Sequence, residues 1–279
     1  MDELKWAGFL AKSFKRGKNI LAGIGDDCAA IKDKRGYLLI SSDLFIENVH
    51  FKLKGMSFSD IGARAASRAI SDIAACCGQP QYLVVSAGVP SYISSSAMKQ
   101  IFRGIEKTAL LCKTKVIGGD TARAECLFLD IWVYGRTRHP VLRRGAKAGD
   151  YIFLSGRLGR LPFDRPFLPR LKEAAFLSRI RPTAMIDISD GFLLDLSRLL
   201  EASRKGAVLW KDELPLTKGR GDLRRGEDYE LLFTCPARYR DRLQKKGFFC
   251  VGKILGKRGI FLEERGILKK LTAGGYLHF

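Results

Sequence analysis

Aspartates recur in this chain at the ends of apolar segments, beside Ser, Thr or Gly. The pattern begins with an acidic pair in "GIGDDCAAI" (23–31) and returns in "SSD" (41–43), "SD" (71–72), "GGDT" (118–121) and "DISDG" (187–191). Carboxylates and hydroxyls are the ligands that hard cations such as Mg²⁺ prefer, and glycines let such turns approach one another closely. Together these elements favour a site for several cations that recruits a polyphosphate.

Each aspartate taken alone also fits a structural role, because an acid after a strand usually caps a helix or closes a turn. Three of them fit that role better than a ligand role: Asp60, Asp150 and Asp195. In the segment 184–204 we expect a strand, a tight turn and a helix with Leu193, Leu196, Leu199 and Leu200 on one face. Alternation places Asp187 and Ser189 on one side of that strand, and Asp190 opens the helix, whose N-terminus favours a phosphate.

Two glycine patterns do not support the nucleotide motifs that they resemble. In "GIGDDC" a cysteine replaces the last glycine of a dinucleotide fingerprint, and two carboxylates would repel a pyrophosphate unless metal intervenes. In "GKILGK" the glycines are too close for a phosphate loop, and Arg258 stands where Ser or Thr would contact magnesium.

Composition indicates a globular protein with an anion-binding bias. The 279 residues suffice for one large domain or two ordinary ones, and 46% are hydrophobic. No apolar run approaches the roughly 20 residues that a membrane span needs. Lys and Arg number 49 against 29 acids, a net charge of +20, which favours anionic partners. The basic residues lack the aromatic interleaving of an RNA-binding sheet, so we expect neither nucleic acid nor membrane as a partner.

The seven cysteines and the N-terminus point to a cytoplasmic location. The cysteine count is odd and no CxxC occurs, as expected for reduced thiols rather than disulfides or a zinc site. The first 14 residues lack the layout of a secretory signal and predict an amphipathic helix.

Helical and strand patterns alternate along the chain, which predicts an α/β (α+β) fold. A helix with Asp60 as N-cap and Gly78 as its stop, and a second helix over 94–111, lie between apolar strands. The segment 126–135 alternates as a strand does. The charged segment 136–150, broken by Pro140, is a candidate domain junction.

Eight motifs occur in the order seen in thiamine-monophosphate kinases. They are "GIGDDCAAI", "SSDLFIENVHF", "SDIAACCGQP", "VIGGDT", "LRRGAKAGD", "MIDISDG", "GEDYELLF" and "GGYLHF". The similarity runs from about residue 20 to Phe279. The chain therefore resembles this family, which shares a superfamily with aminoimidazole ribonucleotide synthetases, selenophosphate synthetases and a hydrogenase-maturation protein.

The resemblance implies a two-domain, synthetase-like fold and a reaction. Residues 1–138 would form an N-terminal sheet domain that binds ATP and Mg²⁺ and pairs in a homodimer. Residues 139–279 would form an α/β domain that closes over the site. ATP would donate its γ-phosphoryl group to thiamine monophosphate, giving thiamine diphosphate, with several Mg²⁺ ions in the site.

The resemblance also assigns site residues. Magnesium positions are matched by Asp27, Ser41, Ser42, Asp43, Asp72, Asp120, Asp187 and Asp190. ATP contacts are matched by Gly119, Asp120, Arg143 and Ser189. Positions around the thiamine phosphate are matched by His50, Glu227 and Tyr276. Asp43, Asp120 and Arg143 would carry the transfer, with Arg143 neutralising the charge that develops on the transferred group.

The chemistry suits these assignments. Phosphoryl transfer needs alignment and charge neutralisation more than covalent chemistry. The acceptor phosphate, with a second pKa near ~6, is largely ionised at neutral pH and needs no strong base. Tyr276 suits stacking on a cationic thiazolium ring. Of the opening pair, we expect Asp27 to be the ligand and Asp26 a turn residue.

Two segments are shorter than is usual in the family, at Gly159–Pro169 and between Leu216 and Glu227. Both belong to the part that would close over the acceptor. Two alternatives stay open at this point. One is a sibling ATP-dependent synthetase acting on another acceptor, and the other is a non-catalytic basic protein that binds nucleotide or nucleic acid.

Overall fold

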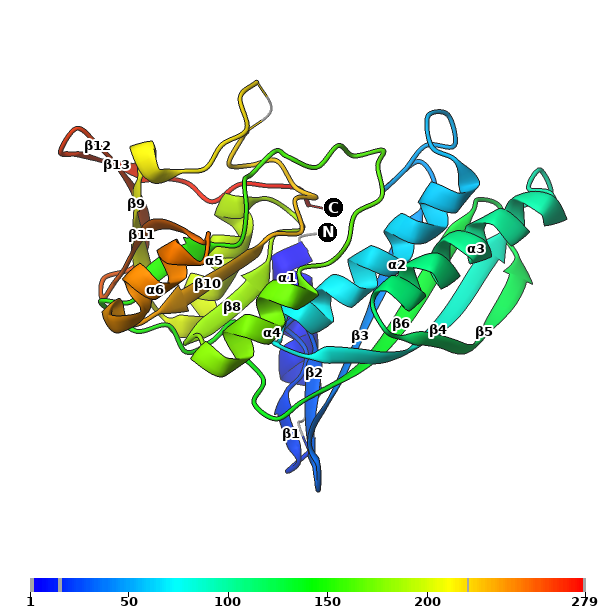
Figure 1. Ribbon diagram of the computed structural model, residues 1–279, viewed down its shortest axis with the longest axis horizontal. Helices are drawn as coiled ribbons and strands as arrows, with labels where there is room; N and C mark the ends of the chain where they lie inside the picture. The colour runs from blue at the N-terminus through cyan, green and yellow to red at the C-terminus, as the bar shows by residue number, and fades with distance from the viewer. Residues whose placement is uncertain (1–2, 15–16, 220, 278–279) are drawn as a thin grey trace.

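The computed structural model describes residues 3–14, 17–219 and 221–277 as two sheets with helices around them (Figure 1). The helices are α1 (Glu3–Ser13), α2 (Phe58–Ala75), α3 (Ser95–Leu111), α4 (Leu171–Ile180), α5 (Phe192–Ser203) and α6 (Arg240–Lys245), with short 3-10 turns η1 (Lys211–Glu213) and η2 (Ala237–Tyr239). The first sheet contains β1 (Ile20–Ala22), β2 (Ala29–Asp33), β3 (Gly36–Ile46), β4 (Gln79–Val89), β5 (Lys115–Arg123) and β6 (Phe128–Thr137). The second contains β7 (Tyr151–Leu154), β8 (Ala184–Asp187), β9 (Gly206–Trp210), β10 (Leu231–Cys235), β11 (Phe249–Leu255), β12 (Gly259–Glu264) and β13 (Ile267–Leu271). The expected mixture of helices and strands is confirmed.

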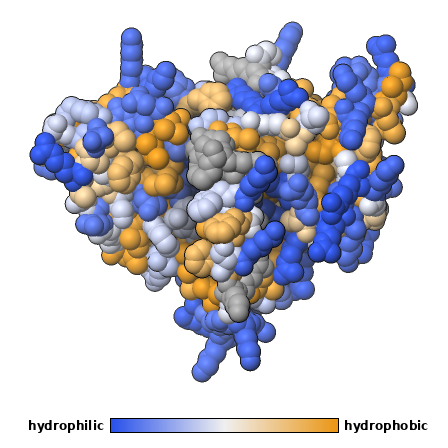
Figure 2. Space-filling model, turned by 180° about the vertical axis from the view of Figure 1, so that it is seen from behind, coloured by the Kyte–Doolittle hydropathy of each residue, from blue (hydrophilic) through white to orange (hydrophobic). Residues whose placement is uncertain are grey.

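The six-stranded sheet has the order β1-β2-β3-β6-β4-β5, and α2 and α3 cover one of its faces (Figure 1). The alternation in β6 explains this layering, because Leu129, Ile131 and Val133 are buried under the helices while Trp132 is exposed. Other apolar side chains that are exposed on β3, β4 and β5 are Leu44, Tyr82, Val116 and Ile117. Seen from behind, apolar groups interrupt the hydrophilic surface on the side of this sheet (Figure 2).

The start of α2 differs from the prediction. Ser57, not Asp60, is the N-cap: it has extended backbone angles, and its side chain accepts a hydrogen bond from the amide of Asp60 at 3.1 Å. Asp60 therefore lies in the first turn, where an acid favours the helix dipole. At the other end the helix stops at Cys76, and the amide of Gly78 donates to the carbonyl of Ile73.

The seven-stranded sheet has the order β13-β12-β9-β11-β7-β10-β8. On α5 the apolar face expected from the sequence is confirmed, because Leu193, Leu196, Leu199 and Leu200 are all buried in one core cluster with strands of this sheet. The strand β8 ends at Asp187, at the edge of the sheet nearest to α2 (Figure 1). The end of this strand therefore faces the other half of the molecule.

The helix α2 packs against both sheets. Its C-terminal residues Ala74 and Ala75 belong to a core cluster with Phe153, Leu177 and Met185 of the second sheet and α4. The chain leaves the first sheet at Thr137 and enters the second at Tyr151, so the expected domain boundary at 138/139 falls in the connection. This boundary stays a prediction.

All seven cysteines are free thiols, and six of them are buried. Among the described residues, no helix combines the length and apolar character needed to cross a membrane.

Candidate active site

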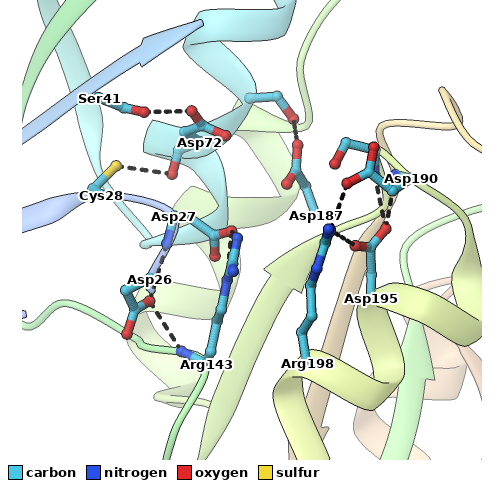
Figure 3. A network of polar contacts seen from close by, with 12 residues as sticks. Asp26, Asp27, Cys28, Ser41, Asp72, Arg143, Asp187, Asp190, Asp195 and Arg198 are labelled. Carbon is cyan, nitrogen blue, oxygen red and sulfur yellow. Dashed lines mark hydrogen bonds and ion pairs between the residues drawn. The ribbon is translucent and has the colours of Figure 1, made fainter. Parts of the chain in front are cut away.

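Three aspartates from distant parts of the chain meet between the two sheets. Asp27 comes from the turn before β2, Asp72 from α2 and Asp187 from the end of β8 (Figure 3). One carboxylate oxygen of each lies within 4.8 Å of the others. The side chains point toward a common space, and all three belong to the predicted magnesium set.

Hydroxyl groups rather than cations hold two of these carboxylates. Ser41 donates to Asp72 and Ser71 donates to Asp187, each at 2.5 Å. Asp27 differs, because Arg143 contacts its Oδ1 through Nε at 3.0 Å and through a terminal nitrogen at 2.6 Å. Its second oxygen is buried and has no hydrogen-bond partner among the described residues. A buried, unpartnered carboxylate oxygen beside two more carboxylates is a favourable place for a cation.

The pKa values show how unfavourable this cluster is without a cation. Burial, followed by the charges of Asp187, Asp43 and Asp27, raises the pKa of Asp72 well above its ordinary value. Burial, followed by the charge of Asp27, raises the pKa of Asp187 to about 8. The clustered acids resist ionisation because desolvation and mutual repulsion disfavour their charged forms. A divalent cation would remove that repulsion.

The donor set fits a hard cation such as Mg²⁺. The cluster offers carboxylate oxygens, with the Ser41 and Ser71 hydroxyls next to it. A neighbouring group of possible ligands includes Asp26 and the thiol of Cys76. A hydrogen bond with Cys28 lowers the pKa of the Cys76 thiol, but burial and nearby acids outweigh it and the net pKa is raised. A protonated thiol is a poor ligand, so the oxygen cluster is the better site.

Two other predicted magnesium ligands lie nearby but are paired with arginine. Asp43 accepts from Arg68, with Nε to Oδ2 at 2.9 Å. Asp190 forms an ion pair with Arg198, which also contacts Asp195 (Figure 3). Their assignment as metal ligands stays a prediction, because these carboxylates already have a cationic partner.

The turn after β8 is shaped by Asp195, as its structural interpretation predicts. Its Oδ2 accepts hydrogen bonds from the backbone amides of Ser189 and Asp190, each at 3.0 Å. Asp150 is likewise structural, since its Oδ2 accepts hydrogen bonds from the backbone amide of Lys147 and the hydroxyl of Thr183. Asp26 lies in a turn, as expected, because its amide donates to the carbonyl of Gly23 at 3.1 Å; its Oδ1 also accepts a hydrogen bond from the amide of Arg143 at 3.1 Å.

A pocket of about 760 Å³ adjoins the carboxylate cluster. It collects most of the predicted site residues along its wall: Ser42, Asp43, His50, Asp72, Asp187, Ser189, Asp190, Glu227 and Tyr276. Residues from both sheets line it, so the site depends on how the two halves pack together.

The three residues predicted to surround the acceptor are well anchored. Nδ1 of His50 accepts a hydrogen bond from the backbone amide of Ile46 at 3.0 Å, which favours the imidazole tautomer that carries the proton on Nε2. Glu227 has a left-handed backbone with φ 66°, and its carboxylate is bonded to Arg64 and Arg68 of α2. The amide of Tyr276 donates to the carbonyl of Asp190, tying the C-terminal segment to the pocket.

Two predicted nucleotide residues lie elsewhere on this chain. Gly119 and Asp120 belong to β5, every residue of which is exposed. Asp120 pairs with Ser86 on β4. Ser86 pairs with Asp130 on β6, and Asp130 pairs with Leu44 on β3. Three strand spacings of about 4.8 Å place Asp120 roughly 14 Å from β3. Within one chain, the fold does not bring Asp120 to the other carboxylates.

Sequence reasoning missed the cations of the pocket. Lys52, Lys54, Arg224 and Arg225 all line it. The signal was present, because 218–225 is among the densest basic runs of the chain. These residues make the pocket a match for an anion.

Comparison with known proteins finds relatives that match nearly the whole chain. Residues 25–137 match the family model of AIR synthase related protein, N-terminal domain. The chain is 31% identical to a thiamine-monophosphate kinase of Rhodopirellula baltica, over 93% of this chain and 91% of that protein. It is 28% identical to the enzyme of that name from Pyrococcus abyssi, over 91% and 90% of the two chains. The solved structure of AaThiL complexed with AMPPCP and TMP superposes with a TM-score of 0.88 and 26% identity, covering 100% of this chain and 97% of that one.

Proposed function

The chain belongs to the thiamine-monophosphate kinases, and on this premise we propose that it transfers the γ-phosphoryl group of ATP to thiamine monophosphate, giving thiamine diphosphate and ADP. The observation that carries the proposal is the meeting of Asp27, Asp72 and Asp187 beside a pocket lined by cations from both halves of the chain. Such an arrangement suits two phosphorylated molecules that must approach each other.

We propose that Asp27, Asp72 and Asp187 hold Mg²⁺, with Asp43 and Asp190 as further candidates. Magnesium would supply charge neutralisation between the two phosphate groups. The unpartnered oxygen of Asp27 and the raised pKa values of Asp72 and Asp187 support this assignment.

The protein's own groups perform the remaining work. Arg143 contacts Asp27 and so lies beside the carboxylate cluster, where its charge favours a transferring phosphoryl group. Lys52, Lys54 and Arg224 line the pocket and would bind the phosphate of the acceptor. That phosphate, with a second pKa near ~6, is largely ionised at neutral pH. No general base is therefore required.

We also propose a homodimer formed through the outer face of the six-stranded sheet. Leu44, Tyr82, Ile117 and Trp132 are exposed on strands of this sheet, and exposed apolar groups gathered on one face mark interfaces. A dimer through this face would bring the exposed strand β5, with the predicted nucleotide residues Gly119 and Asp120, against a second copy. A cytoplasmic location fits the free thiols.

The test is a direct assay. Purified protein is incubated with ATP, Mg²⁺ and thiamine monophosphate, and thiamine diphosphate and ADP are separated by chromatography. We expect both products in equal amounts and only when Mg²⁺ is present. ADP without thiamine diphosphate, or neither product, would overturn the proposed reaction.

A further inference from the structure

The segment 160–168, here called the strap, contains no helix or strand, yet it is firmly held. It separates two pockets: residues 163 and 164 line the pocket of the candidate active site, and residues 165–168 line a second one of about 630 Å³. An irregular segment between two pockets needs other groups to satisfy its backbone.

Side chains from elsewhere in the fold bind the carbonyls of the strap. Arg225 donates to the carbonyl of Leu161 at 2.6 Å. Arg64, whose side chain is fully buried on α2, donates to the carbonyls of Arg165 at 2.5 Å and Pro162 at 3.3 Å. Ser67 donates to the carbonyl of Phe167. Within the strap, the amide of Arg165 donates to the carbonyl of Pro162 at 3.4 Å, and the remaining contacts that position it come from α2 and from the segment before β10.

Ring packing fixes which side of the strap faces which pocket. Phe167 stacks on Tyr229, with ring centres 4.3 Å apart and planes 13° apart. The guanidinium of Arg64 lies over Phe167 at 5.4 Å. These contacts fix the C-terminal end of the strap at Phe167. Phe163 and Asp164 then face the active-site pocket, while Leu168 lines the second pocket.

Phe163 and Asp164 place an aromatic ring and a carboxylate on the strap side of the active-site pocket. Phe163 is 53% exposed, and the guanidinium carbon of Arg225 lies over its ring, 4.3 Å from the ring centre. Among the described residues, Asp164 forms no ion pair, although cations surround the pocket. A flat ring beside a carboxylate is complementary to a flat heterocycle that carries positive charge, with the ring giving stacking and the carboxylate giving charge.

We propose that the strap is the wall that selects the acceptor, with Phe163 stacking on its cationic heterocycle and Asp164 balancing the charge. The inference rests on the proposed function, in which the acceptor joins such a ring to a phosphate. The cations of the pocket bind the phosphate end, and the strap binds the other end. Because the strap is held in place in advance, little conformational entropy is lost on binding.

The test compares variants of the strap in the full-length protein. Binding of thiamine monophosphate is measured by titration calorimetry without ATP, and KM is measured separately for acceptor and ATP. We expect Phe163→Ala and Asp164→Asn each to weaken acceptor binding about tenfold. The KM for ATP and the melting temperature should stay near wild-type values.

Two further variants serve as controls. Phe163→Trp keeps a flat ring and should retain acceptor binding. Leu168→Ala removes an exposed side chain from the same strap on the side of the second pocket, and it should change neither substrate's KM.

The outcomes separate this inference from the proposed reaction. If the wild type forms thiamine diphosphate but Phe163→Ala binds the acceptor normally, the role of the strap is wrong and the reaction stands. If binding depends on Phe163 and Asp164 but no thiamine diphosphate forms, the strap recognises the ring and the proposed reaction is wrong. Equal losses in Phe163→Ala and Leu168→Ala would also overturn the inference, because they would indicate a general disturbance of the strap.

Discussion

Neutralising Asp187 should stabilise the protein while abolishing its activity. The carboxyl is buried, Ser71 is its one hydrogen-bond donor among the described residues, and Asp27 and Asp72 lie beside it. Its pKa rises from the ordinary 3.8 to about 8. Each tenfold change in proton affinity corresponds to about 1.4 kcal/mol, so ionising this group at pH 8 costs folding up to about 5 kcal/mol.

Asp187→Asn removes the charge and keeps an oxygen for Ser71. The amide also brings an NH₂ group that needs a partner, so we expect a net gain of about 2 kcal/mol rather than the full amount. For a chain of this size that gain corresponds to a rise of about 3–6 °C in melting temperature. The measurement is thermal unfolding at pH 8 in a buffer that contains a chelator.

Adding Mg²⁺ and ATP should reverse the order of the two proteins. A ligand at about 100 times its Kd stabilises the folded state by about 2.7 kcal/mol. The wild type should gain this stability, and the variant, which lacks a carboxylate of the cluster, should gain much less.

Asp43→Asn is the matched control. Asp43 is paired with Arg68, so its neutralisation should lower the melting temperature in the chelating buffer. An Asp187→Asn variant that melts below the wild type in chelator, or that keeps the full response to Mg²⁺ and ATP, would refute the view that this carboxylate is held ready for a cation.

Three further changes test other parts of the structure. Arg64→Ala removes one of the two arginine partners of Glu227 and the shared donor of two strap carbonyls, and it should cost about 3–5 kcal/mol in urea unfolding; a loss below about 1 kcal/mol would contradict the positioning role. Burial raises the pKa of Asp228 to about 6, so the folded state holds this proton more tightly than the unfolded state. The stability that Asp228 contributes is present below about pH 4 and is lost as the pH rises toward 6. Asp228→Asn should therefore remove up to about 3 kcal/mol of the fall in unfolding free energy over this range, and an unchanged dependence of unfolding free energy on pH would contradict the prediction. Trp132→Lys places a charge on the exposed sheet face and should shift sedimentation from dimer to monomer, whereas an unaffected dimer would exclude this face as the interface.

Local patterns predicted much of the fold correctly. The alternation of β6 and the leucine face of α5 were readable because side-chain burial follows the period of a strand or helix. The cap of α2 was not, since Ser57 and Asp60 are both good capping residues and only the backbone angles at Ser57 decide between them.

The sequence by itself determined which residues are candidates for the chemistry, namely the aspartates behind short strands and their neighbouring hydroxyls, and it determined the order of motifs shared with the kinases. The tertiary structure decided which of them meet. It brings Asp27, Asp72 and Asp187 together. It also pairs Asp43 and Glu227 with arginines of α2, and it leaves Asp120 on a distant strand. Electrostatic energy depends on distance and on burial, and both are set by how α2 packs between the two sheets rather than by any local spacing in the chain.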